Sequence, residues 1–150
     1  MLSRCARLLP IVVLIVAATG CQAADGPSGR PSSPSNAQNA AEMARVVEQA
    51  RALDTVIDVK GVYDTSLTTY GQTDLIATVA AGTPAARTDE LADELIALIW
   101  RSRIDPITSM GASVVPPGGD PSQGSLAGRS VDSGGGFTRL AEKLGPRPPG

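Results

Sequence analysis

The sequence predicts a small α+β domain, because the period of its apolar residues changes along the chain. Apolar side chains recur at helical spacing over residues 41–53, alternate with polar ones over 55–65 and 73–81, and return to helical spacing after residue 84. Segments rich in Pro, Gly and Ser, expected to be disordered, flank this region at 21–39 and 117–136. Residues 40–116 are therefore expected to form the folded domain, with one modest core.

The first helix and two strands follow from this pattern. Residues 41–53 place one apolar stripe on a helix, made of Met43, Val46, Val47, Ala50 and Leu53. Residues 55–65 and 73–81 each alternate as a strand with one buried face does, and Gly61 is a candidate bulge. The residues between these strands are expected to form a hairpin loop.

The second helix and a third strand follow. Thr83 and Pro84 are a suitable N-cap and first turn, with Thr88 as an alternative start. The apolar arc of this helix contains Leu91, Ala92, Leu95, Ile96, Leu98 and Ile99. Residues 107–115 predict a weaker strand that begins after Pro106.

The order helix, strand, strand, helix, strand predicts two helices on one face of a three-stranded, mostly antiparallel sheet. This αββαβ order resembles a truncated ferredoxin-like fold. It is also similar in outline to small domains appended to some bacterial transporters and envelope proteins. The resemblance is architectural and implies no function by itself.

The first 21 residues have the three parts of an export signal. Arg4 and Arg7 precede an apolar run over 8–17, which ends in the small residues Ala18, Thr19 and Gly20 and then Cys21. The run is too short to span a bilayer, which needs about 20 apolar residues. This arrangement resembles the lipobox of bacterial lipoproteins, with Ala18 at a position usually held by Leu.

The lipoprotein resemblance implies a lipid-anchored protein. The signal peptide, residues 1–20, would be cleaved between Gly20 and Cys21, and Cys21 would carry a diacylglyceryl thioether and an acylated amino group. Residues 21–39 would be a disordered tether at the extracytoplasmic face of the cell membrane. A plain secretory signal with an incidental Cys21 and an uncleaved anchor are the alternatives.

A short tail, residues 137–150, contains a second amphipathic pattern. Phe137, Leu140, Ala141 and Leu144 recur at i, i+3, i+4 and i+7, which predicts a short helix with one apolar face. A helix of this length is not stable alone in water, so the stripe must dock on another surface. Either its own sheet or a groove on an envelope partner would serve, since the linker 117–136 permits both; a frayed tail is the third possibility.

Composition argues against several function classes. The chain has 13 basic and 15 acidic side chains, four aromatic ones and no histidine. It therefore lacks the basic stripe and stacking platform of nucleic-acid binders, and nucleic acid is not expected as a partner. Histidine-dependent triads and His-ligated metals are excluded, and no phosphate-binding loop or Gly-x-Ser-x-Gly motif occurs. We expect no cofactor, no metal and no catalytic residue.

Two hypotheses of function follow. The leading one is a non-catalytic lipoprotein that binds or scaffolds another envelope component, through an open sheet face or the tail helix. The alternative is an enzyme or small-ligand carrier that uses carboxylates, for which the candidates are Asp89, Glu90, Asp93 and Glu94. Their spacing is also that of the solvated face of an amphipathic helix, which is the simpler interpretation.

Overall fold

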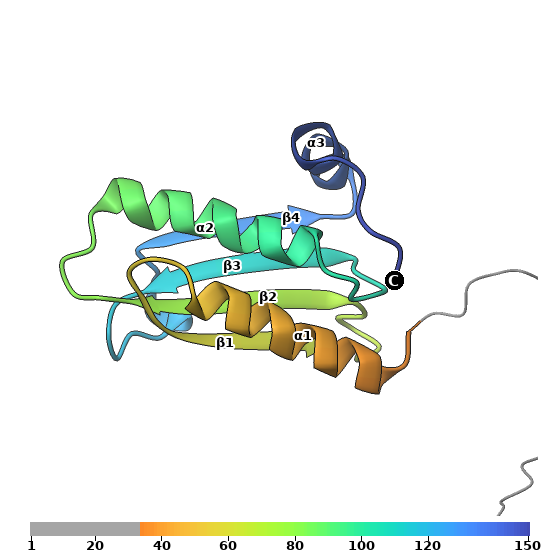
Figure 1. Ribbon diagram of the computed structural model, residues 1–150, viewed down its shortest axis with the longest axis horizontal. Coiled ribbons are helices and arrows are strands. Elements are labelled where there is room, and N and C mark those ends of the chain that lie inside the picture. Colours follow the sequence, from red (N-terminus) through yellow and green to blue (C-terminus); the bar gives the residue numbers. More distant parts are fainter. Residues whose placement is uncertain (1–33) are drawn as a thin grey trace, which may run out of the picture. The chain divides into compact units, whose positions relative to one another are not determined.

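The computed structural model describes residues 34–150, which form an α+β domain with helices packed on a mixed sheet (Figure 1). The helices are α1 (Asn36–Arg51), α2 (Ala85–Trp100) and α3 (Gly135–Leu144). The strands are β1 (Val56–Asp64), β2 (Gln72–Val79), β3 (Ser109–Val115) and β4 (Ala127–Asp132), with a 3₁₀ turn η1 (Pro121–Gln123) before β4. The predicted α+β class is confirmed.

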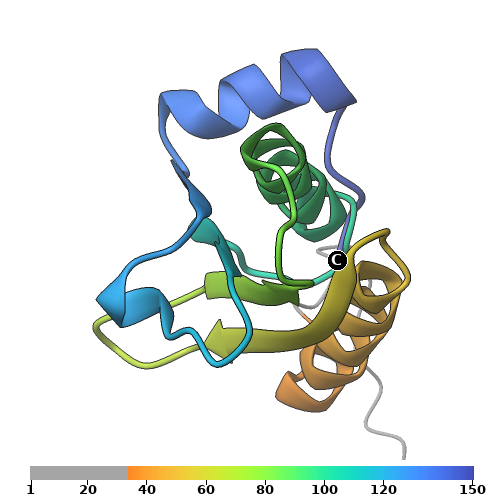
Figure 2. The same ribbon diagram turned by 90° about the vertical axis from the view of Figure 1, so that its left-hand side faces the viewer.

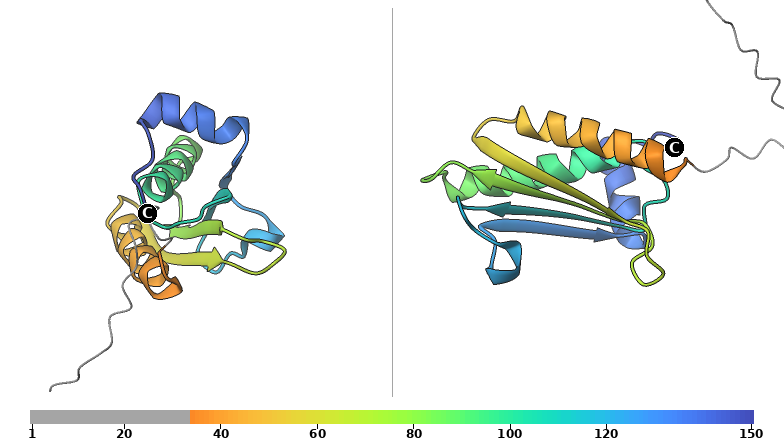
Figure 3. Two further views of the ribbon diagram at one scale, coloured as in Figure 1. Left: turned by 90° about the vertical axis from the view of Figure 1, so that its right-hand side faces the viewer. Right: turned by 90° about the horizontal axis from the view of Figure 1, so that it is seen from below.

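The sheet has the order β1-β2-β3-β4. The two outer pairs are antiparallel and the central pair, β2 and β3, is parallel, with α2 as the crossover between them. Helices α1 and α2 cover one face of the sheet, whereas no helix of residues 34–150 covers the opposite face (Figures 1 and 3). Helix α3 lies beside α2 at the β4 edge (Figure 2).

Strand β4 corrects the predicted linker. Residues 117–136 were expected to be flexible, but Ala127–Asp132 pairs with β3 and adds a fourth strand to the sheet, with Val131 opposite Met110. The sequence signal was weak because Arg129 occupies a helix-facing position between Ala127 and Val131. Its charge is compensated by Asp89 and Asp93 of α2, at 3.2 and 2.8 Å. Alternation of apolar residues alone could not detect such a strand.

Helix α1 begins earlier than predicted. Ser35 is its N-cap, and the Ser35 hydroxyl and Gln38 side chain form a reciprocal capping box. Residues 36–39, which the sequence assigned to the tether, are therefore the first turn of the helix. The signal peptide, Cys21 and the rest of the expected tether lie outside the described residues.

Gly61 is not the bulge in β1. The irregular register lies between Val56 and Asp58, which leaves Ile57 exposed. Gly61 instead lets α1 approach the sheet, because an added Cβ would lie 2.5 Å from the sulfur of Met43 and 2.7 Å from a methyl group of Val47. The glycine is therefore required by packing.

The core lies between the sheet and its two covering helices. The predicted stripes of β2 and α2 are buried as expected, and β3 contributes alternate residues; the largest fully buried side chains include Val46, Leu75, Leu91, Leu95, Ile99, Met110 and Val114. Pro84, not Thr83, is the N-cap of α2, since the Thr83 hydroxyl donates to the carbonyl of Ala80 at 2.7 Å. The predicted helix and strand positions therefore hold, while their ends shift.

Candidate binding surfaces

The apolar stripe of α3 contacts its own domain. Phe137, Leu140, Ala141 and Leu144 are partly buried against the core. The ring of Phe137 meets the indole of Trp100 edge-on, and the Trp100 Nε1 donates to the carbonyl of Gly145 at 2.9 Å. The apolar stripe is thus covered by the chain itself, which is the first of the three alternatives above.

The acidic cluster on α2 does not form a carboxylate site. Asp89, Glu90, Asp93 and Glu94 have side chains between 41% and 69% exposed. They separate into two ion-paired sets, Asp89 and Asp93 with Arg129, and Glu90 and Glu94 with Arg87. Because all four carboxylates are largely exposed to solvent, the cluster offers no buried carboxyl group for acid–base chemistry.

Within residues 34–150, no group of three or more Asp, Glu, Cys or His side chains is placed to hold a metal ion. No helix in this part of the chain is both long and apolar enough to cross a bilayer. The predicted lipidation residue Cys21 and its neighbour Gly20 are outside the described residues.

The sheet has an open face, which no helix of residues 34–150 covers. Lys60 of β1, Ile76 of β2 and Ser113 of β3 form one cross-strand row on this face, and Val62, Asp74 and Gly111 form the next. Asp74 lies flat over β3, since a Cβ on Gly111 would be 2.0 Å from its Oδ1. The face therefore combines small polar side chains with a few apolar ones.

A depression of about 270 Å³ lies on this open face, and residues of the loop between β3 and β4 form one of its walls. Its lining includes Lys60 on one side and Asp120 on the other, with Ile76, Thr78 and Val115 between them. Hydrogen bonds from Ser122 hold the pKa of the Asp120 carboxyl below its usual range. The depression therefore presents a cation and a carboxylate on either side of a floor that mixes apolar and polar side chains.

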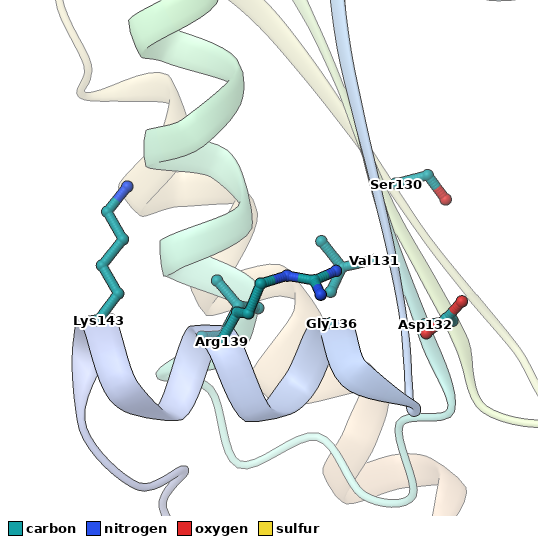
Figure 4. A pocket seen from close by; sticks show the side chains of 7 residues that line it. Ser130, Val131, Asp132, Gly136, Arg139 and Lys143 are labelled. Carbon is teal, nitrogen blue, oxygen red and sulfur yellow. The ribbon is translucent and has the colours of Figure 1, made fainter.

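A second, smaller cleft of about 200 Å³ separates β4 from α3. In Figure 4 the guanidinium of Arg139 extends toward β4, whereas Lys143 lies at the far end of α3 and its ammonium is well separated from that guanidinium. Ser130, Val131, Asp132, Gly136 and Leu140 complete the lining. The two cations do not converge on one point, so the cleft has no preformed anion site.

The end of the domain where α1 begins is held together by a buried amide. Asn39, which is 2% exposed, donates to the carbonyl of Asp105 at 2.8 Å and to the Tyr63 hydroxyl at 3.2 Å. Its side-chain oxygen accepts from the Asp105 backbone N at 3.1 Å. Sequence reasoning missed this residue, because a single Asn in a polar stretch carries no signal of burial.

Arg147 folds back onto the same end. Its side chain is 17% exposed and its Nη1 lies 3.7 Å from a carboxylate oxygen of Asp105. Burial lowers the pKa of Arg147 and raises that of the neighbouring Tyr63 hydroxyl. These contacts join the tail to the loop before β3, so they are structural in this arrangement.

No family model matches this chain, and neither does any curated protein or solved structure. Its function therefore has to be inferred from the sequence motif and the geometry of these surfaces.

Proposed function

We propose that this chain is a lipid-anchored, non-catalytic module at the extracytoplasmic face of a bacterial cell membrane, which binds another envelope component through its open sheet face. The observation that carries the proposal is the Ala18-Thr19-Gly20-Cys21 motif at the end of the apolar run. It is followed within a short stretch by a compact domain that begins at Ser35. Such a domain would be held close to the membrane by the acyl chains on Cys21.

The non-catalytic part rests on the chemistry of the side chains. The sequence has no histidine, and the four candidate carboxylates of α2 are exposed and ion-paired with Arg87 and Arg129. An enzyme or carrier built on those carboxylates would need them to converge in a pocket. The alternative function therefore loses its main support.

The choice of the open face rests on what the other surfaces already contact. Helices α1 and α2 occupy one face of the sheet, and the apolar side of α3 packs against Trp100 and the core. The open face keeps a depression with Lys60 and Asp120 at its rim. A partner with both charged and apolar groups would complement this surface.

The anchor is tested by intact mass. We expect the membrane-extracted protein to begin at Cys21 and to carry the added mass of its acyl chains, and we expect a Cys21→Ser variant to leave the membrane fraction. Recovery of the parent protein from the soluble fraction with an unmodified thiol would contradict the anchor.

The binding face is tested by site-specific photo-crosslinking in intact cells. A photoreactive residue at Ser113, on the open face, should give a defined crosslinked product. The same photoreactive residue placed at position 48, where Glu48 is exposed on α1, should give no such product. Adding Lys60→Glu to the Ser113 probe should weaken that product. Identical products from both positions, or no effect of Lys60→Glu, would contradict binding through the open face.

A further inference from the structure

Two of the exposed large apolar side chains of the domain lie in one short loop. The β1–β2 hairpin loop, residues 65–71, contains Leu67, which is 103% exposed, and Tyr70, which is 56% exposed. The other residues of the loop are Thr, Ser and Gly, so it carries no charged side chain. Uncharged segments that present an apolar and an aromatic side chain suit the interface of a bilayer.

Several polar groups of this loop are hydrogen-bonded within it. The Asp64 carboxylate, at the base of the loop, accepts from the Ser66 backbone N at 2.7 Å and from the Thr69 hydroxyl at 2.5 Å. The hydroxyls of Ser66 and Thr69 are also bonded to each other at 2.6 Å. A polar group that already has a hydrogen-bond partner within the protein has a smaller free-energy penalty when it is transferred out of water. The free energy needed to move the tip into a less polar medium is therefore reduced.

The base of the loop is fixed to the rest of the sheet. The Thr108 backbone N donates to the carbonyl of Gly71 at 2.9 Å, and the Gly71 N donates to the carbonyl of Asp64 at 2.9 Å. Gly71 has a left-handed φ of 76°, and an added Cβ would lie 2.9 Å from the Pro106 carbonyl oxygen. A loop held in this way presents Leu67 in a defined position and loses little entropy on binding.

The hairpin lies at the end of the domain where the chain enters it. Asn36, in the first turn of α1, and Thr65, in the hairpin loop, line the same depression, and Asn39 donates to the Tyr63 hydroxyl. Figures 1 and 3 show the β1–β2 connection at the end of the sheet where α1 begins. The loop tip and the entry of the chain therefore share one end of the domain.

The chain between Cys21 and this end is short. Only the twelve residues 22–33 separate Cys21 from Pro34, and a connection of that length spans at most about 45 Å. A short covalent link to the bilayer gives the loop a high effective concentration at the membrane surface. An insertion too weak to hold an unanchored domain at the membrane would then be strong enough to keep the loop of the anchored domain in the bilayer surface.

We propose that Leu67 and Tyr70, at the tip of the β1–β2 hairpin, insert into the surface of the same bilayer that holds Cys21. This inference rests on the anchor proposed above. With the hairpin end against the membrane, the strands run away from the bilayer, so the sheet stands upright and its open face points sideways, along the membrane plane. The inserted tip would thus orient the binding face for a partner.

The test places a tryptophan at the tip and measures its quenching by lipid. The mature chain, which begins at the acylated Cys21, is prepared with Leu67→Trp and reconstituted into vesicles of phosphatidylcholine with brominated acyl chains. The matched control is Ala81→Trp, at the exposed turn after β2, at the opposite end of that strand. The parent chain, whose single tryptophan Trp100 is buried, supplies the background.

We expect most of the added emission of Leu67→Trp to be lost in brominated vesicles, with little loss for Ala81→Trp. Adding Tyr70→Asp to Leu67→Trp should restore part of the emission. Equal quenching of the two tryptophans, or none, would overturn the proposal. A blue shift of Leu67→Trp that depends on protein concentration, without quenching, would indicate contact with a second copy and would also overturn it.

A failure of the anchor is distinguishable from a failure of the hairpin. If the mass of the protein shows a free thiol at Cys21, the anchor is wrong. The thiol, in a Cys5→Ser background, can then be coupled to a maleimide-headgroup phospholipid and the quenching measured in the same vesicles. Selective quenching of Leu67→Trp in that chain would support the insertion of the tip, and its absence would refute it.

Discussion

Phe137 and Trp100 are in edge-to-face contact, with ring centroids 5.5 Å apart and ring planes at 81°. The contact joins the last residue of α2 to the start of α3, and the bond from Trp100 Nε1 to the carbonyl of Gly145 holds the other end of the same helix. A helix of ten residues that is marginal alone thereby becomes part of the domain.

Truncation of Phe137 should therefore destabilise the whole domain. We expect Phe137→Ala to lower the free energy of unfolding by about 2 kcal/mol, because a partly buried aromatic ring and its contact with Trp100 are lost. Urea denaturation followed by Trp100 fluorescence measures the change. Thr138→Ala, exposed on the same helix, is the control. If both variants unfold alike, the tail does not stabilise the domain.

The buried amide of Asn39 provides a second prediction. Asn39→Ala should destabilise the domain by about 1–3 kcal/mol, because the backbone groups of Asp105 lose their partners inside the protein. Alanine has the higher helix propensity, so the loss cannot come from α1 itself. Asn36→Ala, at an exposed position of the same helix, should change stability little in the same urea titration. A neutral Asn39→Ala would show that water replaces these bonds.

Gly61 should not tolerate a side chain. Gly61→Ala inserts a methyl group against Met43 and Val47, and we expect a loss of about 1–3 kcal/mol from overpacking. Gly128→Ala in β4 is the control, because its nearest neighbours would be 3.4 and 3.6 Å away. Thermal unfolding monitored by circular dichroism should lower the Tm for Gly61→Ala only. Equal Tm values would mean that α1 can move away from β1 without cost.

Glu42 should make the free energy of unfolding depend on pH in the acidic range. Its carboxylate accepts from Arg45 Nε at 2.9 Å and from the Arg103 backbone N at 2.9 Å, which ties α1 to the residues after α2. The hydrogen bond from Arg45 is the largest cause that lowers the pKa of Glu42, and it outweighs the opposing effect of partial burial.

The sign of the effect follows from proton linkage. A carboxyl group with a lowered pKa in the folded state stabilises the fold fully above its unfolded pKa of about 4.3, and this contribution is lost as the pH falls through the folded value. Glu42→Gln should therefore be less stable than the parent at neutral pH, with the difference narrowing on acidification below about pH 4. Urea titrations across this range measure it; a difference independent of pH would rule out the linkage.

Helical and strand periods were readable from the chain because they are local. The apolar stripes over residues 41–53 and 91–99 and the alternation over 73–81 identified α1, α2 and β2 from local spacing alone, with ends that differ by a few residues from those of the structure. The same reasoning found the short α3 stripe from Phe137 to Leu144. Each of these patterns is imposed by the geometry of the backbone within one element.

Residues whose roles depend on distant partners could not be identified in this way. Asn39 is buried only because Asp105 lies against it, and Arg129 is accepted in β4 only because Asp89 and Asp93 face it. Gly61 is needed only because α1 crosses it closely. Strand β4 lacked a pattern because its stability comes from pairing with β3 more than from its own side chains.

The sequence by itself determined the α+β class and the amphipathic segments, since these depend on residue types and their spacing along a few turns or strands. Tertiary structure alone decided that β2 and β3 run parallel, that β4 closes the sheet, and that the tail packs on Trp100. These outcomes depend on which surfaces meet in space, and burial of a surface lowers the free energy only where another surface is positioned to cover it.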